Sequence, residues 1–70
     1  MDRQPVSSSN LKSVGYDESS KILEIEFHSG GVYHYYSVPS SVYQDLMIAP
    51  SHGKYFLAHI KDVYRYERIR

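Results

Sequence analysis

The chain has 70 residues, in which eight lysines and arginines balance eight aspartates and glutamates, and it contains eight tyrosines but no cysteine. This length predicts one small domain with a thin core, because a chain of about 60 residues buries only about 60% of the surface that it exposes when unfolded. The lack of cysteine excludes disulfides, thiolate metal sites and a cysteine nucleophile. A net charge of zero gives no argument for a nucleic acid or a membrane as partner.

No part of the sequence is apolar enough for a membrane helix. The longest uninterrupted apolar run covers residues 46–49, whereas a spanning helix needs about 20 residues. No apolar run follows Met1, as a signal peptide would require. We therefore expect a soluble, cytoplasmic protein without a membrane partner.

The first nine residues have little to bury. After Met1 they hold one apolar side chain, Val6, together with Pro5 and a run of three serines. Such a segment cannot offset the entropy lost on ordering. The composition predicts a disordered, dispensable arm over residues 1–9 and a single domain over residues 10–70.

Three strands are predicted to follow the arm. Residues 11–16 are apolar and aromatic enough for a short strand, although their alternation is imperfect, and residues 17–20 favour a turn. Residues 22–28 alternate cleanly between apolar and polar side chains, as a strand with one solvated face does. Residues 32–38 form a second β-branched and aromatic run. These segments predict an antiparallel meander.

The turn at residues 29–31 sets which side chains face the core. A three-residue loop with Gly31 in the left-handed region would pair His28 with Val32, and Glu26 with His34. This register places five side chains on the core face: Leu23, Ile25, Phe27, Tyr33 and Tyr35. A two-residue loop would instead turn Val32, His34 and Tyr36 inward. We favour the first register because the two tyrosines bury more apolar surface.

Two short helices and a closing strand complete the predicted fold. Pro39 favours the start of a helix over residues 39–49, which Pro50 ends. Ser51 is a suitable N-cap for a second helix, which ends near Lys61. Residues 63–69 alternate again. The sequence thus predicts an α+β fold, with a small antiparallel sheet of three strands, extendable by a C-terminal strand, and two short helices on one face.

Several motifs in order resemble one known family. They are Tyr16-Asp17, residues 23–27, Ser29-Gly30-Gly31, Tyr33-His34-Tyr35, Val38-Pro39, residues 49–56 and residues 64–69. Together they resemble the KTSC domain, which is named after the C-terminus of some lysyl-tRNA synthetases and also occurs as free-standing bacterial proteins. The resemblance implies a small auxiliary module without an established function, for which attachment to a synthetase suggests RNA binding.

The C-terminal third suits such a role, since five of the eight basic residues lie in the last 17 positions. Cations interleaved with aromatic rings suit a phosphate backbone with stacked, unpaired bases. The candidate RNA-binding residues are Lys54, Tyr55, Lys61, Tyr64, Arg65, Tyr66 and Arg68. A purely structural interpretation stands beside this one, because tyrosines at strand and helix spacing usually belong to a core or its rim.

A second candidate site is the predicted start of the second helix. Free backbone N–H groups and the positive end of the helix dipole favour an anion there, and we assign Ser51, Gly53 and Lys54 to it. The structural interpretation requires only Ser51 as a cap and Gly53 as a close-packing residue against the sheet. A Walker A loop is not present, so nucleotide triphosphate chemistry is not implied.

Metal binding and catalysis have weaker support. His52 and His59 would lie about 10 Å apart along one helix, too far to share an ion, and no motif orders Ser, His and Asp for nucleophilic catalysis. We therefore expect no metal, no cofactor and no enzymatic activity. The predicted function is a binding module with RNA as the first candidate partner. The alternative is a protein–protein interaction module that binds no nucleic acid.

Overall fold

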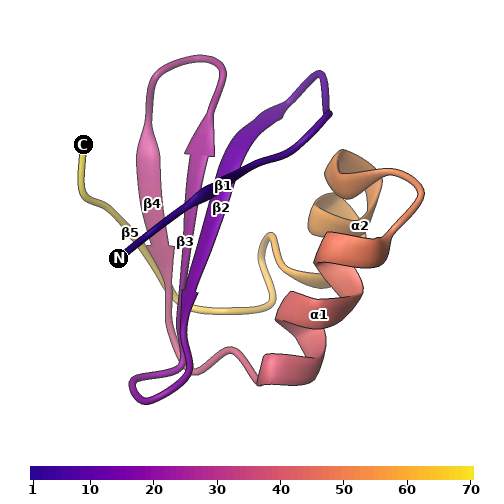
Figure 1. The fold of residues 1–70 in the computed structure, drawn as a ribbon. Coiled ribbons are helices and arrows are strands. Elements are labelled where there is room, and N and C mark those ends of the chain that lie inside the picture. Colours follow the sequence, from indigo (N-terminus) through magenta and orange to yellow (C-terminus); the bar gives the residue numbers. More distant parts are fainter.

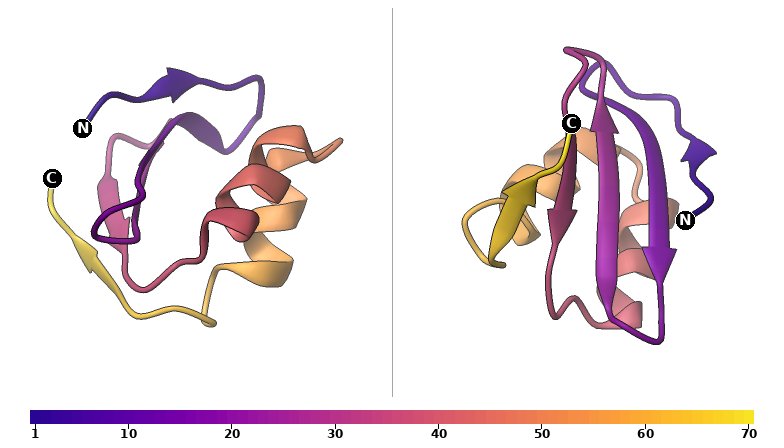
Figure 2. Two further views of the ribbon diagram at one scale, coloured as in Figure 1. Left: turned by 60° about the horizontal axis from the view of Figure 1, so that its bottom comes forward. Right: turned by 90° about the vertical axis from the view of Figure 1, so that its left-hand side faces the viewer.

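Five strands form one antiparallel sheet in which the spatial order follows the chain order (Figure 1). The strands are β1 (Gln4–Pro5), β2 (Leu11–Asp17), β3 (Ile22–Phe27), β4 (Val32–Tyr35) and β5 (Tyr66–Arg68). The helices α1 (Ser40–Ile48) and α2 (His52–His59) lie between β4 and β5 in the sequence. Both cover the same face of the sheet (Figure 2). The computed structural model describes residues 1–70. Neither helix has the length and apolar character needed to cross a bilayer.

The α+β fold predicted from the sequence is confirmed, with both helices on one face and a C-terminal strand. Helix α1 begins directly after Pro39, and Ser51 caps α2 by accepting a hydrogen bond from the Lys54 backbone N–H at 3.2 Å. The closing strand is shorter than the predicted residues 63–69. Residues 60–64 instead form the turn and bend that return the chain from the helices to the sheet.

In the hairpin between β3 and β4, each side chain lies on the predicted face of the sheet, but the strands pair in a different register. Leu23 pairs with Tyr35, and Ile25 with Tyr33, so the predicted register is wrong by two residues. The loop closes one residue earlier than expected, because the Phe27 N–H donates to the Gly31 carbonyl, and its positive φ, 106°, lies at Gly30 rather than Gly31. Because side chains alternate with a period of two, this shift leaves each of them on its predicted face.

The imperfect alternation of β2 arises from a bulge. Its register against β3 shifts between Leu11 and Ser13. The additional residue, Lys12, allows Leu11 and Val14 to face the core together, and both are almost fully buried.

The core lies between the two helices and the sheet. Its buried side chains are Leu11, Val14, Leu23, Ile25, Tyr35, Val38, Leu46, Phe56 and Ile60. Three aromatic contacts join the layers. On α2, the Phe56 ring packs edge-on against Tyr35 and Phe27 of the sheet, with centroids 5.6 and 5.4 Å apart. On α1, Tyr43 stacks on Tyr16 at 4.8 Å.

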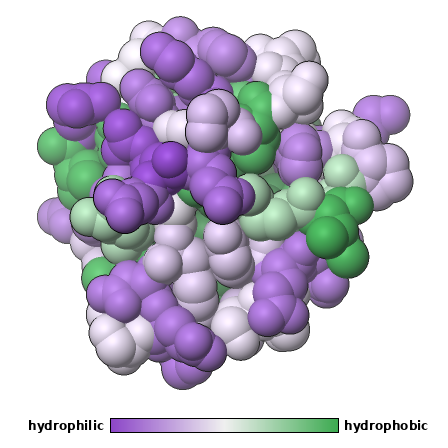
Figure 3. Space-filling view, viewed as in Figure 1, coloured by the Kyte–Doolittle hydropathy of each residue, from purple (hydrophilic) through white to green (hydrophobic).

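N-terminal residues lie against the sheet where the composition predicts a disordered arm. Gln4 pairs with Val14, and Pro5 with Ser13. Arg3 donates from Nε to Ser13 Oγ at 2.9 Å. A Cβ at Gly15 would lie 2.7 Å from the Asp2 carbonyl oxygen, so this approach depends on glycine. The view from the side of β1 is mostly hydrophilic, with small, separate apolar areas (Figure 3).

Glu24 is the buried partner of the arm, on the face of the sheet that the helices leave open. Its side chain accepts a hydrogen bond from Arg3 Nη1 at 2.6 Å, and its other oxygen lies 2.7 Å from His34 Nε2. The predicted pairing of His34 with Glu26 is therefore replaced by pairing with Glu24, as the register shift requires. Burial raises the pKa of Glu24, but the hydrogen bonds from His34 and Arg3 outweigh it and hold the pKa below its ordinary value.

Replacing Tyr35 with Ala should lower the free energy of unfolding by about 3–5 kcal/mol, as expected for removing a large aromatic side chain from a core. Tyr35→Phe should cost little, because the Tyr35 hydroxyl accepts and donates no hydrogen bond within the protein. Urea denaturation of the two variants measures both effects. A small loss in Tyr35→Ala would contradict the core position of this ring.

Deleting residues 2–6 tests two different predictions. The composition predicts a dispensable arm, whereas the structure pairs this segment with β2. A dispensable arm predicts an unchanged melting temperature. The contacts of Arg3 predict a loss of about 1–3 kcal/mol at neutral pH, because the Glu24 carboxylate would lose its charged hydrogen bond from Arg3. Thermal unfolding of the deleted chain decides between the two.

The pH dependence of that loss identifies its cause. The lowered pKa of Glu24 contributes stability above the pKa of an unfolded glutamate, and this contribution disappears as the pH falls through the folded-state pKa. The difference between the full and the deleted chain should therefore shrink on acidification. A difference that stays constant with pH would assign the stabilisation to contacts other than the ion pair.

Candidate functional site

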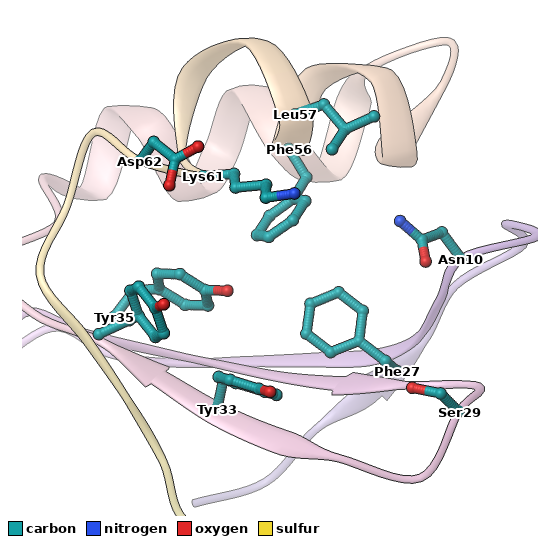
Figure 4. Close-up of a pocket in the computed structure, with 10 residues that line it drawn as sticks. Asn10, Phe27, Ser29, Tyr33, Tyr35, Phe56, Leu57, Lys61 and Asp62 are labelled. Atoms are coloured by element: carbon teal, nitrogen blue, oxygen red, sulfur yellow. The ribbon is translucent and has the colours of Figure 1, made fainter.

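A groove runs between helix α2 and the sheet (Figure 4). Its volume is about 320 Å³, which lies at the lower end of the range for small-molecule sites. The lining residues are Asn10, Phe27, Ser29, Tyr33, Tyr35, Phe56, Leu57, Lys61, Asp62 and Tyr66. They come from the residue before β2, from β3, β4 and the turn between them, from α2 and the turn after it, and from β5. The groove therefore exists only in the assembled fold.

Aromatic rings form the wall of the groove on the side of the sheet. Tyr66 pairs with Tyr35 across β4 and β5, and its ring centroid lies 5.7 Å from that of Tyr35 and 5.9 Å from that of Tyr33. Tyr35 is buried, Tyr33 is half-buried, and Tyr66 is 55% exposed. Tyr66 thus offers a ring that is held by its neighbours and still accessible to a ligand.

The tyrosine hydroxyls of the groove are free to bind a ligand. The hydroxyls of Tyr16 and Tyr36 donate to Val38 and Glu67, whereas those of Tyr33, Tyr35 and Tyr66 make no hydrogen bond within the protein. Burial raises the pKa of Tyr35 to about 12, with smaller contributions from the neighbouring Tyr33, Tyr66 and Asp62. The Tyr35 hydroxyl therefore remains protonated at physiological pH and can donate a hydrogen bond.

Charged side chains stand at the rim of the groove. In the turn that follows α2, the N–H groups of Ile60 and Lys61 both donate to the Phe56 carbonyl, and Asp62 comes next with a left-handed φ of 64°. Lys61 and Asp62 both line the groove (Figure 4). On the sheet side, the Arg68 guanidinium lies 6.0 Å from the centroid of the Tyr33 ring.

The residues assigned to an anion site lie in a neighbouring hollow. Residues 7–10, residues 50–54 and Leu57 line it, and it shares Asn10 and Leu57 with the groove. Ser51 is occupied as the helix cap, while Lys54 is exposed. The structural interpretation expects Gly53 to pack closely against the sheet. Gly53 lies instead near Ser8 and Asn10. The hollow extends the groove toward the start of α2.

The structure brings together only part of the RNA-binding set that the sequence suggests. Lys61 and Tyr66 line the groove, Arg68 borders it, and Lys54 lies in the adjoining hollow. Arg65 does not line the groove: its guanidinium lies 5.2 Å from the centroid of Tyr36, whose hydroxyl binds Glu67. Since Glu67 pairs with His34, Arg65 lies toward the open face of the sheet, where it lines a different hollow with Tyr36, Tyr66 and Glu67.

The remaining two residues of that set pack among the helices. The Tyr55 ring lies 4.5 Å from the ring of His59, and Tyr64 packs against the core. Burial raises the pKa of Tyr55, as do Asp45 and Tyr64 nearby. These two tyrosines are half-buried and do not line the groove.

Several groove residues were not recognised as candidates in the sequence. Tyr33 and Tyr35 are assigned to the core, and nothing in their neighbourhood distinguishes a ring that is wholly covered from one that borders a groove. Asp62 and Asn10 are single polar residues between elements. They meet the aromatic rings only through the register of β4 with β5 and the packing of α2, which no local pattern reveals.

The histidines lie in separate places. His34 binds Glu24 on the open face, and His52 Nδ1 lies 2.8 Å from the Leu46 carbonyl oxygen, where it links α2 to α1. His59 contacts Tyr55. No three His, Asp or Glu side chains gather in a way that could hold a metal ion.

Comparisons with known proteins place the chain in a family. The model of the KTSC domain matches residues 7–64. An uncharacterized protein of Stutzerimonas stutzeri is 47% identical over 70 residues, which cover 99% of each chain. A crystal structure of a KTSC domain protein from Yersinia pestis superposes with a TM-score of 0.96 at 42% identity, covering 99% of this chain and 97% of the other.

The chain also matches part of a much longer protein. A lysine–tRNA ligase of Nostoc punctiforme is 43% identical over 59 residues, which make up 84% of this chain and 10% of the ligase. The match to the family model covers β2, β3, β4 and both helices, and it ends before β5. The resemblance seen in the sequence is thereby confirmed, and the chain belongs to the KTSC domain family.

Proposed function

We propose that this KTSC domain binds single-stranded RNA in the groove between α2 and the sheet. The observation that carries the proposal is the position of Tyr66, whose exposed ring lies at the groove beside Lys61 and near Arg68. An accessible ring provides a stacking surface for a base, and cations beside it attract the phosphates on either side.

The shape of the groove also supports an unpaired strand. A duplex presents its phosphates on a wide, rigid surface, whereas a single strand can place one base into a narrow groove and keep its backbone at the rim. Lys54 in the adjoining hollow gives the backbone a third cation along the same side of α2. The similarity to part of a lysine–tRNA ligase is consistent with this partner class.

Binding rather than catalysis is the role that we propose. The groove is open to solvent, and its lining combines tyrosine hydroxyls, one lysine and one aspartate without a histidine. A nucleophile held by a general base would need a hydrogen bond between the two groups. None of the hydroxyls that line the groove is bonded in this way.

The proposal predicts salt-sensitive binding that depends on groove residues. The probe is a fluorescently labelled, mixed-sequence single-stranded RNA, followed by anisotropy over a series of salt concentrations. Lys61→Gln and Arg68→Gln should each weaken binding and reduce the slope of log affinity against log salt by about 0.7. Tyr66→Ala should weaken it by about 1–3 kcal/mol, the value of one stacked base.

Arg65→Gln is the matched control, because it removes one positive charge from the same C-terminal segment on the other side of the sheet. It should bind nearly as well as the unaltered chain, and circular dichroism should show all variants folded. Absence of salt-sensitive binding at low ionic strength contradicts the proposal. An effect of Arg65→Gln equal to that of Lys61→Gln contradicts the assignment to the groove.

A protein partner is the second candidate, and one observation favours it. Leu57, which lines both the groove and the hollow, is 54% exposed. An exposed apolar side chain beside aromatic rings suits a protein interface. Binding to a protein through this surface would respond little to salt and would weaken in Leu57→Ser, whereas binding to RNA would depend mainly on the cations.

A further inference from the structure

We infer that Asp62 selects the base that enters the groove and that the preferred base is an unpaired guanine. This inference rests on the proposed function, since it names the nucleotide that the same groove reads. It is based on the position of Asp62, an acidic side chain beside the cations that we propose to bind phosphates.

Asp62 is unpaired within the protein. It lines the groove beside Lys61 (Figure 4), yet the ion pairs of the protein involve Glu24 and Glu26 instead. Its carboxylate also makes no hydrogen bond to a neighbouring side chain. A lone carboxylate next to a phosphate path repels the backbone, and a ligand that brings a hydrogen-bond donor to the carboxylate offsets this repulsion.

The backbone holds Asp62 in a defined place. The N–H groups of Val63 and Tyr64 both donate to the Ile60 carbonyl, at 3.1 and 3.3 Å, and so close the turn around Asp62. The φ of 64° at Asp62 lies in the left-handed region, which aspartate and asparagine adopt more readily than most residues. The carboxylate is therefore presented from a fixed turn rather than from a flexible loop.

The stacking ring and the carboxylate converge on the same neighbour. Tyr66 packs against Tyr35, and the negative charge of Asp62 acts on the Tyr35 hydroxyl. All three line one groove. A base stacked on the exposed ring of Tyr66 can therefore turn its hydrogen-bonding edge toward Asp62.

Guanine fits this arrangement better than the other bases. An ionised carboxylate only accepts hydrogen bonds, and its two oxygens can accept two in parallel. Guanine presents two adjacent donors, N1–H and N2–H, on its Watson–Crick edge. Adenine and cytosine each present one amino group beside a ring nitrogen that is itself an acceptor, and uracil presents one N–H between two carbonyls. These acceptors would face the carboxylate unfavourably.

The test compares short RNAs that differ in one central nucleotide. Each is an oligouridine with a single guanosine, inosine, adenosine or cytidine, and affinity is measured by fluorescence anisotropy over a series of salt concentrations that starts low. We expect the guanosine strand to bind about tenfold more tightly than the adenosine and cytidine strands. Inosine lacks the N2 amino group and should bind with intermediate affinity.

The decisive variant is Asp62→Asn, since asparagine keeps the left-handed turn and the size of the side chain but loses the charge. This variant should bind the guanosine strand more weakly than the unaltered chain does. Its affinity for the other strands should be unchanged or slightly higher, so that the preference for guanosine disappears. Asp45→Asn removes the same charge from an exposed position on α1 that does not line the groove and should keep the preference.

The outcomes separate this inference from the proposed function. Equal, salt-sensitive binding of all four strands overturns the role of Asp62 while RNA binding stands. A guanosine preference that survives in Asp62→Asn also overturns it. If no strand binds at any salt concentration, both the proposed function and the choice of guanine are contradicted.

Discussion

The contact between Tyr35 and Phe56 connects the two layers of this small domain. Tyr35 projects from β4 and Phe56 from α2, and their rings meet edge-on at 5.6 Å beneath the groove. A thin core leaves few such contacts, so each large ring carries much of the stability. The same pair forms part of the groove lining, where Tyr35 also supports the exposed ring of Tyr66. Folding and the candidate site therefore depend on the same side chains.

The two faces of the sheet are stabilised in different ways. The helices cover one face with an apolar and aromatic layer. The other face is covered only in part, by N-terminal residues: Arg3 pairs with the buried carboxylate of Glu24, which His34 also contacts. Because this second contact is polar, it adds order without extending the hydrophobic core. Arg3 lies on this open face, away from the groove, whereas residues 7–9 line the hollow that adjoins the groove.

The sequence allowed the elements and their faces to be predicted because both depend on local patterns. Alternation at residues 22–28 identified β3, and the prolines around residues 39–50 delimited α1. The register between β3 and β4 was off by two residues, since either glycine of a Gly-Gly turn can take the left-handed position and the loop closes one residue earlier. The pairing of the arm could not be foreseen, because it depends on Arg3 meeting a glutamate 21 positions away.

The candidate site was predicted in part for the same reason. Charge counting along the C-terminal segment found Lys61, Tyr66 and Arg68, but it could not tell that Arg65 lies toward the other face, with Tyr36. Nor could it find Asp62, whose significance comes from its place at the mouth of the groove. Sites made from residues of several elements become visible only when the topology is known.

Mapping the amide signals of the isotope-labelled protein by NMR during titration with a mixed-sequence single-stranded RNA tests the central claim most directly. The account predicts that the largest shifts occur at groove residues such as Leu57, Lys61, Asp62 and Tyr66, with little change at His34 and Tyr36 on the open face. Shifts concentrated on the open face, or no shifts at low salt, would contradict it.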